Sequence, residues 1–243
     1  MMAVVLAGGK GTRLLPYTAV FPKPLMPLGD MPVLEILLRR LADAGVTEVI
    51  LAVNHLHHLI RAFCGDGRGF GLRIEYCLEE QPLGTAGPLA LMLDRLNENF
   101  IVANGDLLTD FDLEAMVRRH LDKANAASMA VFERKIAIQF GLIETDAEMR
   151  MKAYREKPVL THLVSMGLYV LNRQAVASHL QPNVPLDMPD LMKMLTKAGS
   201  VVDCVQQDCV WLDIGQPADY AEAQSLFETR REMFLQQGAC VLS

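Results

Sequence analysis

The stretch "LAGGKGTRLLPYTAVFPKPL", residues 6–25, begins with the last residue of a short apolar run, residues 3–6. That run holds adjacent β-branched residues and ends just before two glycines, which predicts a buried strand rather than a helix. In an open α/β sheet, the turn that follows a strand lies at the edge where ligands bind. Gly8, Gly9 and Gly11 let backbone N–H groups approach an anion with no Cβ in the way. The stretch therefore predicts an α/β fold with a phosphate-binding loop after its first strand.

A solvated turn is the simpler alternative for this loop. Arg13 and Lys23 favour phosphate binding, because they stand in a segment too apolar and too rich in proline for an ordinary charged surface. The glycine spacing fits neither the P-loop, G-x-x-x-x-G-K-[ST], nor the dinucleotide fingerprint, G-x-G-x-x-G. The loop therefore belongs to a different class of phosphate site.

The composition narrows the class of protein. The chain has 243 residues, 51% of them apolar, which suffices for one α/β core and predicts a single domain. The net charge of −6 argues against nucleic-acid binding, which needs a basic surface. We find no 18-residue uncharged apolar stretch and no basic segment before the first apolar run, so we expect neither a membrane span nor a secretory signal. A cytoplasmic location follows as an expectation.

The cysteines and histidines do not indicate a disulfide framework or a metal centre. The five cysteines are an odd number without a C-x-x-C pair, which predicts buried, reduced thiols. The segment "NHLHHL", residues 54–59, brings His55, His57 and His58 together, but no Cys or His cluster elsewhere supplies a matching half-site. We interpret the three histidines as the polar start of a surface helix.

Strand and helix patterns alternate along the first half of the chain. Proline at the start, helical apolar spacing and glycine at the end predict a helix over 32–45. The same reasoning gives strands over 48–54, 72–78 and 100–104, and helices over 56–63, 85–96 and 113–120. This alternation predicts a doubly wound layout.

The second half shows short strand patterns joined by tight links: "ASMAVFE", "FGLIETD", "MKAYREKP" and "VSMGLYVLN". They predict a mixed sheet with an antiparallel excursion that forms one wall of a cleft. Two helices, near 189–198 and 218–236, complete the predicted elements.

Two aspartates follow apolar strands directly. Asp106 ends "FIVANGD" and Asp213 ends "VWLD", and each has a glycine beside or close to it. If both strands end at one crevice, the two carboxylates form a site for Mg²⁺, which takes one or two protein carboxylates and completes its shell with water and phosphate. Taken singly, each aspartate is equally compatible with an ordinary Asx turn.

With "FPKP" at residues 21–24, the string "LAGGKGTRL" resembles the signature of the sugar-1-phosphate nucleotidylyltransferases. These enzymes join a nucleoside triphosphate to a sugar 1-phosphate and release pyrophosphate. "NGD", "REKP", "SMGLYVL" and "WLDIGQPADYAEA" resemble further motifs of the family in the family's order, so that the match runs from Leu6 to about Ala223. The resemblance implies a Rossmann-like three-layer α/β/α nucleotidyltransferase fold, with a mixed, mostly parallel sheet and a small antiparallel sugar-binding excursion.

The resemblance also implies the site residues and a division of the single domain, 1–243, into a nucleotide half, 1–125, and a sugar-phosphate half, 126–243. It implies catalytic roles for Arg13, Lys23, Asp106 and Asp213, with Asp106 and Asp213 binding Mg²⁺. The nucleotide-binding set that it implies is Leu6, Ala7, Gly8, Gly9, Gly11, Thr12, Arg13, Lys23, Glu79, Gly84, Thr85 and Asp106. On the sugar side, Lys157 would bind the phosphate, Glu156 would contact sugar hydroxyls, and Gly141 and Gly167 would line the pocket.

The segment "PLGTAGPLAL", residues 82–91, most resembles the mannose-1-phosphate guanylyltransferase branch, in a short form without the hexapeptide repeats of a C-terminal β-helix. Glu79 stands five residues before Gly84, where thymidylyl- and uridylyltransferases resemble one another in carrying glutamine. A carboxylate accepts both N1–H and N2–H₂ of guanine, which favours GTP. Glu80 is the nearest competitor for this role, and solvent exposure of both acids is the remaining alternative.

Mannose 1-phosphate is the leading candidate for the sugar, with heptose and cyclitol phosphates as alternatives. Transfer to phosphocholine would call for an aromatic cage, which a chain with 6% aromatics and one tryptophan disfavours. A noncatalytic sensor of nucleotide sugars is the rival from another class, although a sensor has no need of the metal ligands and phosphate cations that the motifs retain. The expected partners are a nucleoside triphosphate and a sugar 1-phosphate. The oligomeric state stays open, with a homo-oligomer as one alternative.

Overall fold

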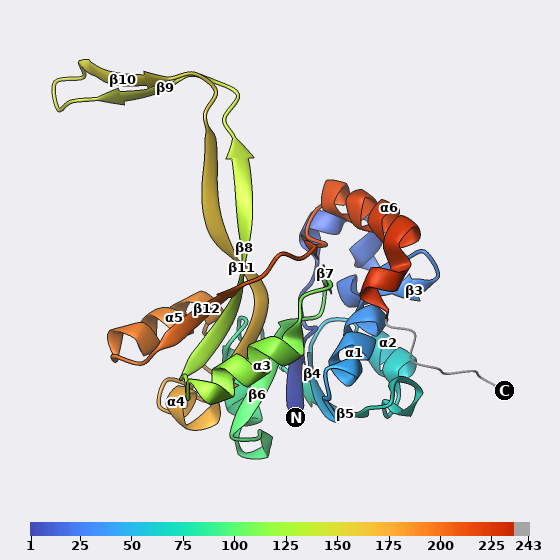
Figure 1. Ribbon diagram of the computed structural model, residues 1–243. Coiled ribbons are helices and arrows are strands. Elements are labelled where there is room, and N and C mark those ends of the chain that lie inside the picture. The colour runs from blue at the N-terminus through green and yellow to red at the C-terminus, as the bar shows by residue number, and fades with distance from the viewer. Residues whose placement is uncertain (236–243) are drawn as a thin grey trace.

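A computed structural model describes residues 1–235 and contains one mixed sheet of seven strands (Figure 1). Its strands lie in the order β12-β8-β11-β6-β1-β4-β5. Strands β6, β1, β4 and β5 run parallel, β11 is antiparallel to both β6 and β8, and β12 is parallel to β8. The strand bounds are β1 Met2–Leu6, β4 Glu48–Val53, β5 Arg73–Leu78, β6 Asn99–Asn104, β8 Ala127–Ala137, β11 Val159–Asn172 and β12 Val202–Gln206. The predicted α/β class with a mostly parallel sheet is confirmed.

Helices cover both faces of this sheet because alternate strand residues point to opposite sides. On one face, Val5 packs in a core with Leu38 of α1 and Met116 of α3. On the other face, Val4 packs with Leu191 of α5. The helix bounds are α1 Val33–Asp43, α2 His57–Cys64, α3 Leu113–Asp122, α4 Arg173–Ala177, α5 Met188–Lys197 and α6 Pro217–Phe234. The three-layer arrangement that the sequence predicts is therefore present.

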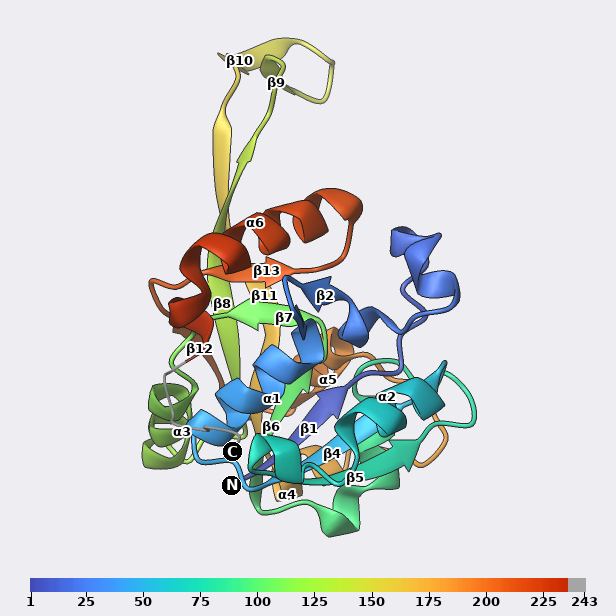
Figure 2. The ribbon, with the colours of Figure 1, turned by 90° about the vertical axis from the view of Figure 1, so that its right-hand side faces the viewer.

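A third, smaller core lies under α6, which crosses above β13 and β2 in Figure 2. Phe227 of α6 is buried there with Leu14 and Ile214. The short strands β7, Leu107–Thr109, and β13, Trp211–Asp213, pair antiparallel at its base, and β2, Pro27–Leu28, pairs with β3, Met31–Pro32. This core ties the segments that follow β1, β6 and β12 to one another.

The predicted helix over 85–96 is wrong. Two 3-10 helices, Gly87–Leu91 and Leu93–Arg95, occupy most of this range. Gly87 and Pro88 disfavour an α-helix interior, since glycine adds backbone entropy and the proline ring clashes with the preceding turn. The N–H groups of Ala86 and Gly87 both donate to the Leu186 carbonyl instead, at 2.8 and 3.0 Å. The other predicted helices are confirmed within a few residues at their ends, except that Gln236 lies outside the described residues.

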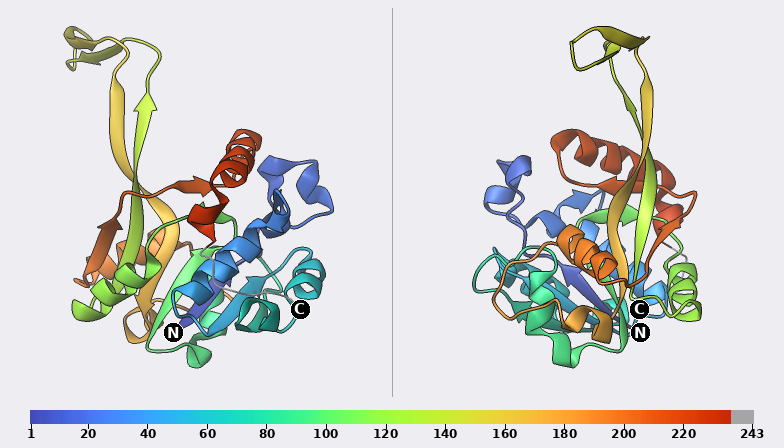
Figure 3. Two further views of the ribbon diagram at one scale, coloured as in Figure 1. Left: turned by 45° about the vertical axis from the view of Figure 1, so that its right-hand side comes forward. Right: turned by 90° about the vertical axis from the view of Figure 1, so that its left-hand side faces the viewer.

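Strands β8 and β11 are far longer than the short strands expected from the sequence. They pair beyond the sheet, from Ser165 opposite Val131 to Val159 opposite Ala137, as a two-stranded ribbon. The hairpin of β9, Leu142–Thr145, and β10, Met151–Arg155, follows at its end. Figures 1 and 3 show this ribbon and hairpin standing clear of the body, so the predicted excursion exists but projects outward instead of forming a wall.

The prediction that the cysteines are buried is confirmed for only some of them. Cys64 and Cys77 are buried, as expected, but Cys204 is exposed and Cys209 is half-buried. Burial raises the pKa of Cys64 to about 12, which keeps that thiol protonated at neutral pH. Cys240 lies outside the described residues.

Within residues 1–235, we find no helix that is both long and apolar enough to cross a membrane. The predicted division into a nucleotide half and a sugar-phosphate half remains a prediction. Strands from both halves share the single seven-stranded sheet, with β6 of the first half paired to β11 of the second.

Candidate active site

A pocket of about 600 Å³ lies at the carboxyl ends of the four parallel strands β1, β4, β5 and β6. Each strand delivers a loop to it, because parallel neighbours end at the same edge of the sheet. The pocket is lined by Leu6, Ala7, Gly8, Gly9, Lys10, Gly11, Thr12, Arg13, Lys23, Pro24, Asn54, Glu79, Pro82, Leu83, Gly84, Thr85, Asn104, Asp106 and Gly215. All twelve residues predicted to bind the nucleotide are among them.

Two glycines of the first loop have no room for a side chain. Gly11 has a φ of +61°, and a Cβ placed there would lie 2.8 Å from Thr18 Cγ2. The Thr18 hydroxyl donates to the Gly11 carbonyl at 2.7 Å and so fixes the turn. A Cβ on Gly8 would lie 2.9 Å from Oε1 of Glu79, which brings the loop directly against that carboxylate. The glycines therefore shape the floor of the pocket.

Glu79 lies buried in the pocket, whereas Glu80 is exposed and does not line it. Oε2 of Glu79 accepts the Leu83 N–H at 3.3 Å, and Oε1 faces Gly8. Burial raises the pKa of Glu79, and the hydrogen bond from Leu83 partly opposes that shift. A carboxylate in this setting gains from a ligand that donates hydrogen bonds to it.

The turn at Gly84 and Thr85 is anchored to the segment before α5. Gly84 has a φ of +75°, and its close approach to the Leu186 carbonyl, 2.6 Å from an ideal Cβ, excludes larger residues. The Thr85 N–H donates to Asp187 Oδ1 at 3.0 Å, and the Thr85 hydroxyl accepts the Met188 N–H at 2.7 Å. Thr85 thus uses these groups to hold the turn in place at the pocket.

The two aspartates predicted from the sequence meet at Lys23. The Lys23 ammonium donates to Oδ2 of Asp106 and lies 3.5 Å from Oδ1 of Asp213. The backbone carbonyl of Asp106 also accepts the Ile214 N–H at 3.3 Å, which links β6 to the end of β13. Arg13 lies beside the cluster, since an ideal Cβ on Gly215 would be 3.7 Å from Arg13 Nη1 and 3.6 Å from Asp213 Oδ2.

This pair of carboxylates fits a magnesium ion by its chemistry. Burial raises the pKa of Asp106, the Lys23 ammonium opposes the shift, and the nearby Asp213 carboxylate adds to it. A cation between the two oxygens relieves their repulsion, which is the part that Lys23 plays here. In the described part of the chain, no three His, Cys, Asp or Glu side chains form a metal cluster, which suits Mg²⁺ better than a transition metal with a full set of protein ligands. His55, His57 and His58 lie at or just before the start of α2.

The four residues predicted for the sugar phosphate fall in two places. Gly167 lies beside the pocket, because a Cβ there, at a φ of +75°, would clash with Nδ2 of Asn104. Gly141, Glu156 and Lys157 lie instead in the links that join the β9–β10 hairpin to β8 and β11. Glu156 accepts the Tyr154 hydroxyl at 2.9 Å, and Tyr154 also closes over Gly141. Within one chain, the structure therefore does not bring these three residues to the pocket.

Asn54 and Asn104 are site residues that the sequence interpretation did not select. Asn54 follows β4, and its side-chain amide donates to the Glu79 carbonyl at 3.0 Å. Asn104 ends β6 and contacts Gly167. Both follow buried parallel strands, so the rule that identified Asp106, a polar residue at the carboxyl end of a strand, also points to them.

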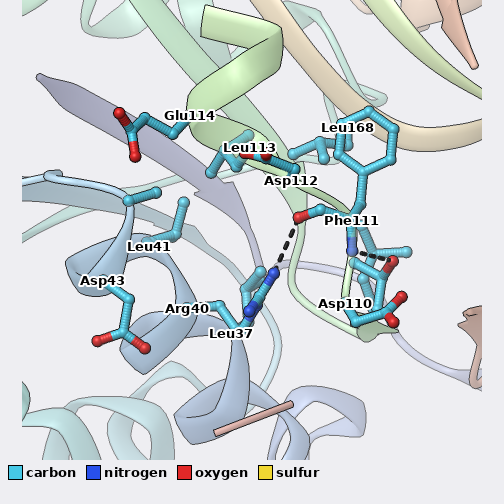
Figure 4. A pocket seen from close by; sticks show the side chains of 13 residues that line it. Leu37, Arg40, Leu41, Asp43, Asp110, Phe111, Asp112, Leu113, Glu114 and Leu168 are labelled. Carbon is cyan, nitrogen blue, oxygen red and sulfur yellow. Dashed lines mark hydrogen bonds between the residues drawn. The ribbon is translucent and has the colours of Figure 1, made fainter. Parts of the chain in front are cut away.

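A second cavity of about 300 Å³ lies between α1, β7 and the start of α3 (Figure 4). Arg40 reaches into it and donates to the Phe111 carbonyl at 2.9 Å, while the Phe111 N–H donates to Thr109 Oγ1 at 3.1 Å. Asp112 caps α3 by accepting the Ala115 N–H at 2.8 Å. These groups therefore stabilise the fold, whereas the residues predicted to bind the nucleotide line the larger pocket.

Comparisons with known proteins agree with this geometry. The family model described as nucleotidyl transferase matches residues 2–230. A mannose-1-phosphate guanyltransferase beta-B from Xenopus laevis is 33% identical over 93% of this chain and 64% of its own length. A UTP–glucose-1-phosphate uridylyltransferase from Synechocystis is 30% identical over 92% of this chain and 62% of its own length. The crystal structure of HddC from Yersinia pseudotuberculosis aligns with a TM-score of 0.73 and 25% identity, over 93% of this chain and 99% of HddC. The chain thus spans slightly less than two thirds of these two sequence relatives.

Proposed function

The chain belongs to the nucleotidyl transferase family, and from that premise we propose that it is a sugar-1-phosphate nucleotidylyltransferase. It would transfer GMP from GTP to a sugar 1-phosphate and release pyrophosphate. The observation that carries the proposal is the convergence of the glycine loop, Arg13, Lys23 and Asp106 at one pocket, with Asp213 beside Lys23. The loop N–H groups and the two cations complement the charge of a triphosphate, and the carboxylates would do so through a bound Mg²⁺.

The reaction needs alignment and neutralisation of charge more than covalent help. An oxygen of the sugar phosphate attacks the α-phosphorus of GTP, and the bond from that phosphorus to the β-phosphate oxygen breaks, so pyrophosphate leaves with the electron pair. The nucleophile is already anionic, so no general base is needed. Mg²⁺ held by Asp106 and Asp213 would neutralise phosphate charge when bound. The backbone N–H groups of the loop, with Arg13 and Lys23, would hold the triphosphate in line.

Guanine is the base that the buried Glu79 carboxylate suits best. Its Oε1 faces the glycine loop, and N1–H and N2–H₂ of guanine are two adjacent donors that a carboxylate accepts together. Uracil and thymine offer a donor beside acceptors on the same edge, and those acceptors would face the carboxylate unpaired. Because a uridylyltransferase is also among the relatives, the test below compares GTP with UTP.

Mannose 1-phosphate is the sugar that we propose first, by analogy with the guanyltransferase relative. Heptose and cyclitol phosphates share its anionic group and stay as candidates. Phosphocholine is disfavoured, because Trp211 does not line the pocket. It packs on Phe132 with ring centroids 5.5 Å apart and donates to the Met166 carbonyl at 3.0 Å.

The test is pyrophosphate release when the protein is mixed with Mg²⁺, one nucleoside triphosphate and one member of a sugar-phosphate panel. We expect release that depends on all three and is fastest with GTP. Tight binding of nucleotide sugars without pyrophosphate release would instead identify a sensor. Release with phosphocholine and none with sugar phosphates would contradict the assignment of the acceptor.

A further inference from the structure

The segment that projects from the body, residues 133–163, is called the arm below. It consists of the outer ends of β8 and β11 and the β9–β10 hairpin between them. Two-stranded β structure of this kind is at best marginally stable in water, because it has no core of its own. The outer pairs, such as Val159 with Ala137 and Leu163 with Glu133, are exposed to solvent in the isolated chain. The arm therefore has the character of a segment that packs against something else.

The arm is also unusually apolar for an exposed segment. Of the nineteen large apolar side chains that are exposed within residues 1–235, eight lie on the arm. Phe140, Met149 and Met151 are 77, 78 and 67% exposed. Exposed apolar groups that gather in one place mark an interaction surface, whereas scattered ones need no explanation.

A second exposed apolar segment lies at the rim of the pocket. Four of the remaining eleven side chains fall within residues 15–21, between the glycine loop and Lys23. They include Tyr17 and Val20, which are 58 and 76% exposed. Arg13 and Lys23, on either side of this segment, both line the pocket. A partner that packs on the segment would therefore also cover the rim of the pocket.

In this structure the arm of one chain does not bring Lys157 to the pocket of the same chain. Gly167 lies against Asn104 at the pocket, and Lys157 lies ten residues earlier in the polypeptide, just before the far end of β11. At about 3.3 Å per residue, the extended strand carries Lys157 roughly 30 Å away, far beyond the length of a lysine side chain. Val159 to Ser165 are paired continuously with Ala137 to Val131, which keeps the arm extended away from the pocket. The pocket is thus incomplete on its sugar-phosphate side.

We propose that two copies of the chain pair by exchanging arms, so that each arm lies across the pocket of the partner. The apolar side chains of the arm would cover residues 15–21 of the partner, and Lys157 and Glu156 would complete its sugar-phosphate site. A two-fold axis makes the exchange reciprocal, which leaves neither arm exposed. The part that concerns Lys157 rests on the proposed function.

Light scattering on the purified protein tests the pairing independently of any activity. We expect the mass of two chains, and Phe140→Ser combined with Met149→Ser should yield single chains with an unchanged circular dichroism spectrum. A single-chain mass for the unmodified protein, or a dimer that survives both substitutions, would overturn the exchange. A protein that pairs through the arm but releases no pyrophosphate with any substrate would refute the proposed function alone.

Complementation tests whether the site is shared. Arg13 and Lys157 are both exposed, so Arg13→Met and Lys157→Met should fold normally and each should lose activity at low sugar phosphate. When the two are unfolded together and refolded as a mixture, half of the pairs are mixed and each mixed pair holds one intact site, so about a quarter of the activity should return. Lys152→Met, a neighbouring exposed lysine on the arm, is the control and should stay active alone. Mixed pairs that form without recovering activity would show that each site is built within one chain.

Discussion

Lys23 Nζ lies 3.5 Å from Oδ1 of Asp213 while it also donates to Asp106, so one ammonium group bridges the two carboxylates. That is the position where we propose that Mg²⁺ binds. The side chain of Lys23 is only 12% exposed, against 40% for Asp213. The ammonium group and the proposed metal would compete for the same oxygens, so the lysine would have to leave at least one carboxylate when the metal binds.

Lys23→Met should therefore tighten divalent-metal binding while it abolishes turnover. Removing the ammonium leaves two close carboxylates without a cation, and the affinity for Mn²⁺, measured by paramagnetic resonance, should rise roughly tenfold or more. Lys10→Met is the matched control, because Lys10 also lines the pocket but forms no ion pair within the described residues. Equal metal affinity in the Lys23 variant and the unmodified protein would show that the ammonium group and the metal do not bind at the same position.

Asp106→Asn and Asp213→Asn should each lower turnover by orders of magnitude and leave the melting temperature nearly unchanged. Each substitution removes one charged ligand at constant size, and phosphoryl-type transfer depends on charge neutralisation. Asp208→Asn, at an exposed position near the start of β13, should retain activity. Near-normal turnover in either of the first two variants would contradict the metal assignment.

The sequence predicts the pocket well because its residues follow buried strands. Each strand is recognisable from its apolar run, and parallel strands deliver their ends to one edge, so the residues after β1, β5 and β6 necessarily converge. The link between Asp106 and Asp213 was less certain from sequence, since β13 pairs with β7 outside the main sheet. The positions of β7 and β13 in the sequence do not predict that they pair.

The arm was not predictable in the same way. Residues 133–137 are three charged side chains followed by two apolar ones, all exposed, so neither an alternating pattern nor a buried face marks them as a strand. The resemblance of "REKP" to a family motif assigns Lys157 to a site, but a motif carries no information on which chain supplies it. Only the three-dimensional placement raises that question.

Arg13→Met should chiefly lower turnover with GTP and leave the requirement for sugar phosphate nearly unchanged. Arg13 lies beside Asp213 at the triphosphate end of the pocket, where negative charge gathers on the leaving pyrophosphate. Steady-state kinetics with each substrate varied in turn give the two parameters separately. A variant that needs far more sugar phosphate but keeps its turnover would show that Arg13 binds the sugar phosphate and not the triphosphate.

The protein should lose stability as the pH falls below about 6.5, the ordinary pKa of histidine. Burial lowers the pKa of His120, whose ring nitrogens lie 2.9 Å from Ser128 Oγ and 3.1 Å from Asn99 Oδ1. The unfolded chain therefore binds a proton at a higher pH than the folded chain. As the pH decreases below about 6.5, the free energy of unfolding decreases as well.

Urea unfolding at pH 7.5 and 5.5 measures this effect. The loss of stability between the two pH values should be smaller in His120→Asn than in the unmodified protein. His58→Asn, at an exposed position on α2, should leave the difference unchanged and keep activity. An equal loss in His120→Asn and the unmodified protein would assign the acid sensitivity to other groups.

Glu79→Gln should lower turnover with GTP and narrow its advantage over UTP and dTTP, whereas Glu80→Gln should do much less. Glu79 is 7% exposed and faces the glycine loop, while Glu80 points to solvent. An amide accepts one hydrogen bond and donates beside it, so it loses one guanine donor but pairs with the donor and acceptor of a pyrimidine. Measuring kcat/KM for each triphosphate gives the preference directly.

The size of the change reports how much the buried carboxylate contributes. A buried group left without its partner costs about 1–3 kcal/mol, so the preference for GTP should shrink by roughly one to two orders of magnitude. Because burial raises the pKa of Glu79, the unmodified protein should also lose some preference at acid pH, and Glu79→Gln should not. The sign follows from the proton, since a protonated carboxyl presents a donor to a base edge that itself donates. Equal use of all triphosphates by the unmodified protein, or a preference untouched by Glu79→Gln at every pH, would remove this carboxylate from base recognition.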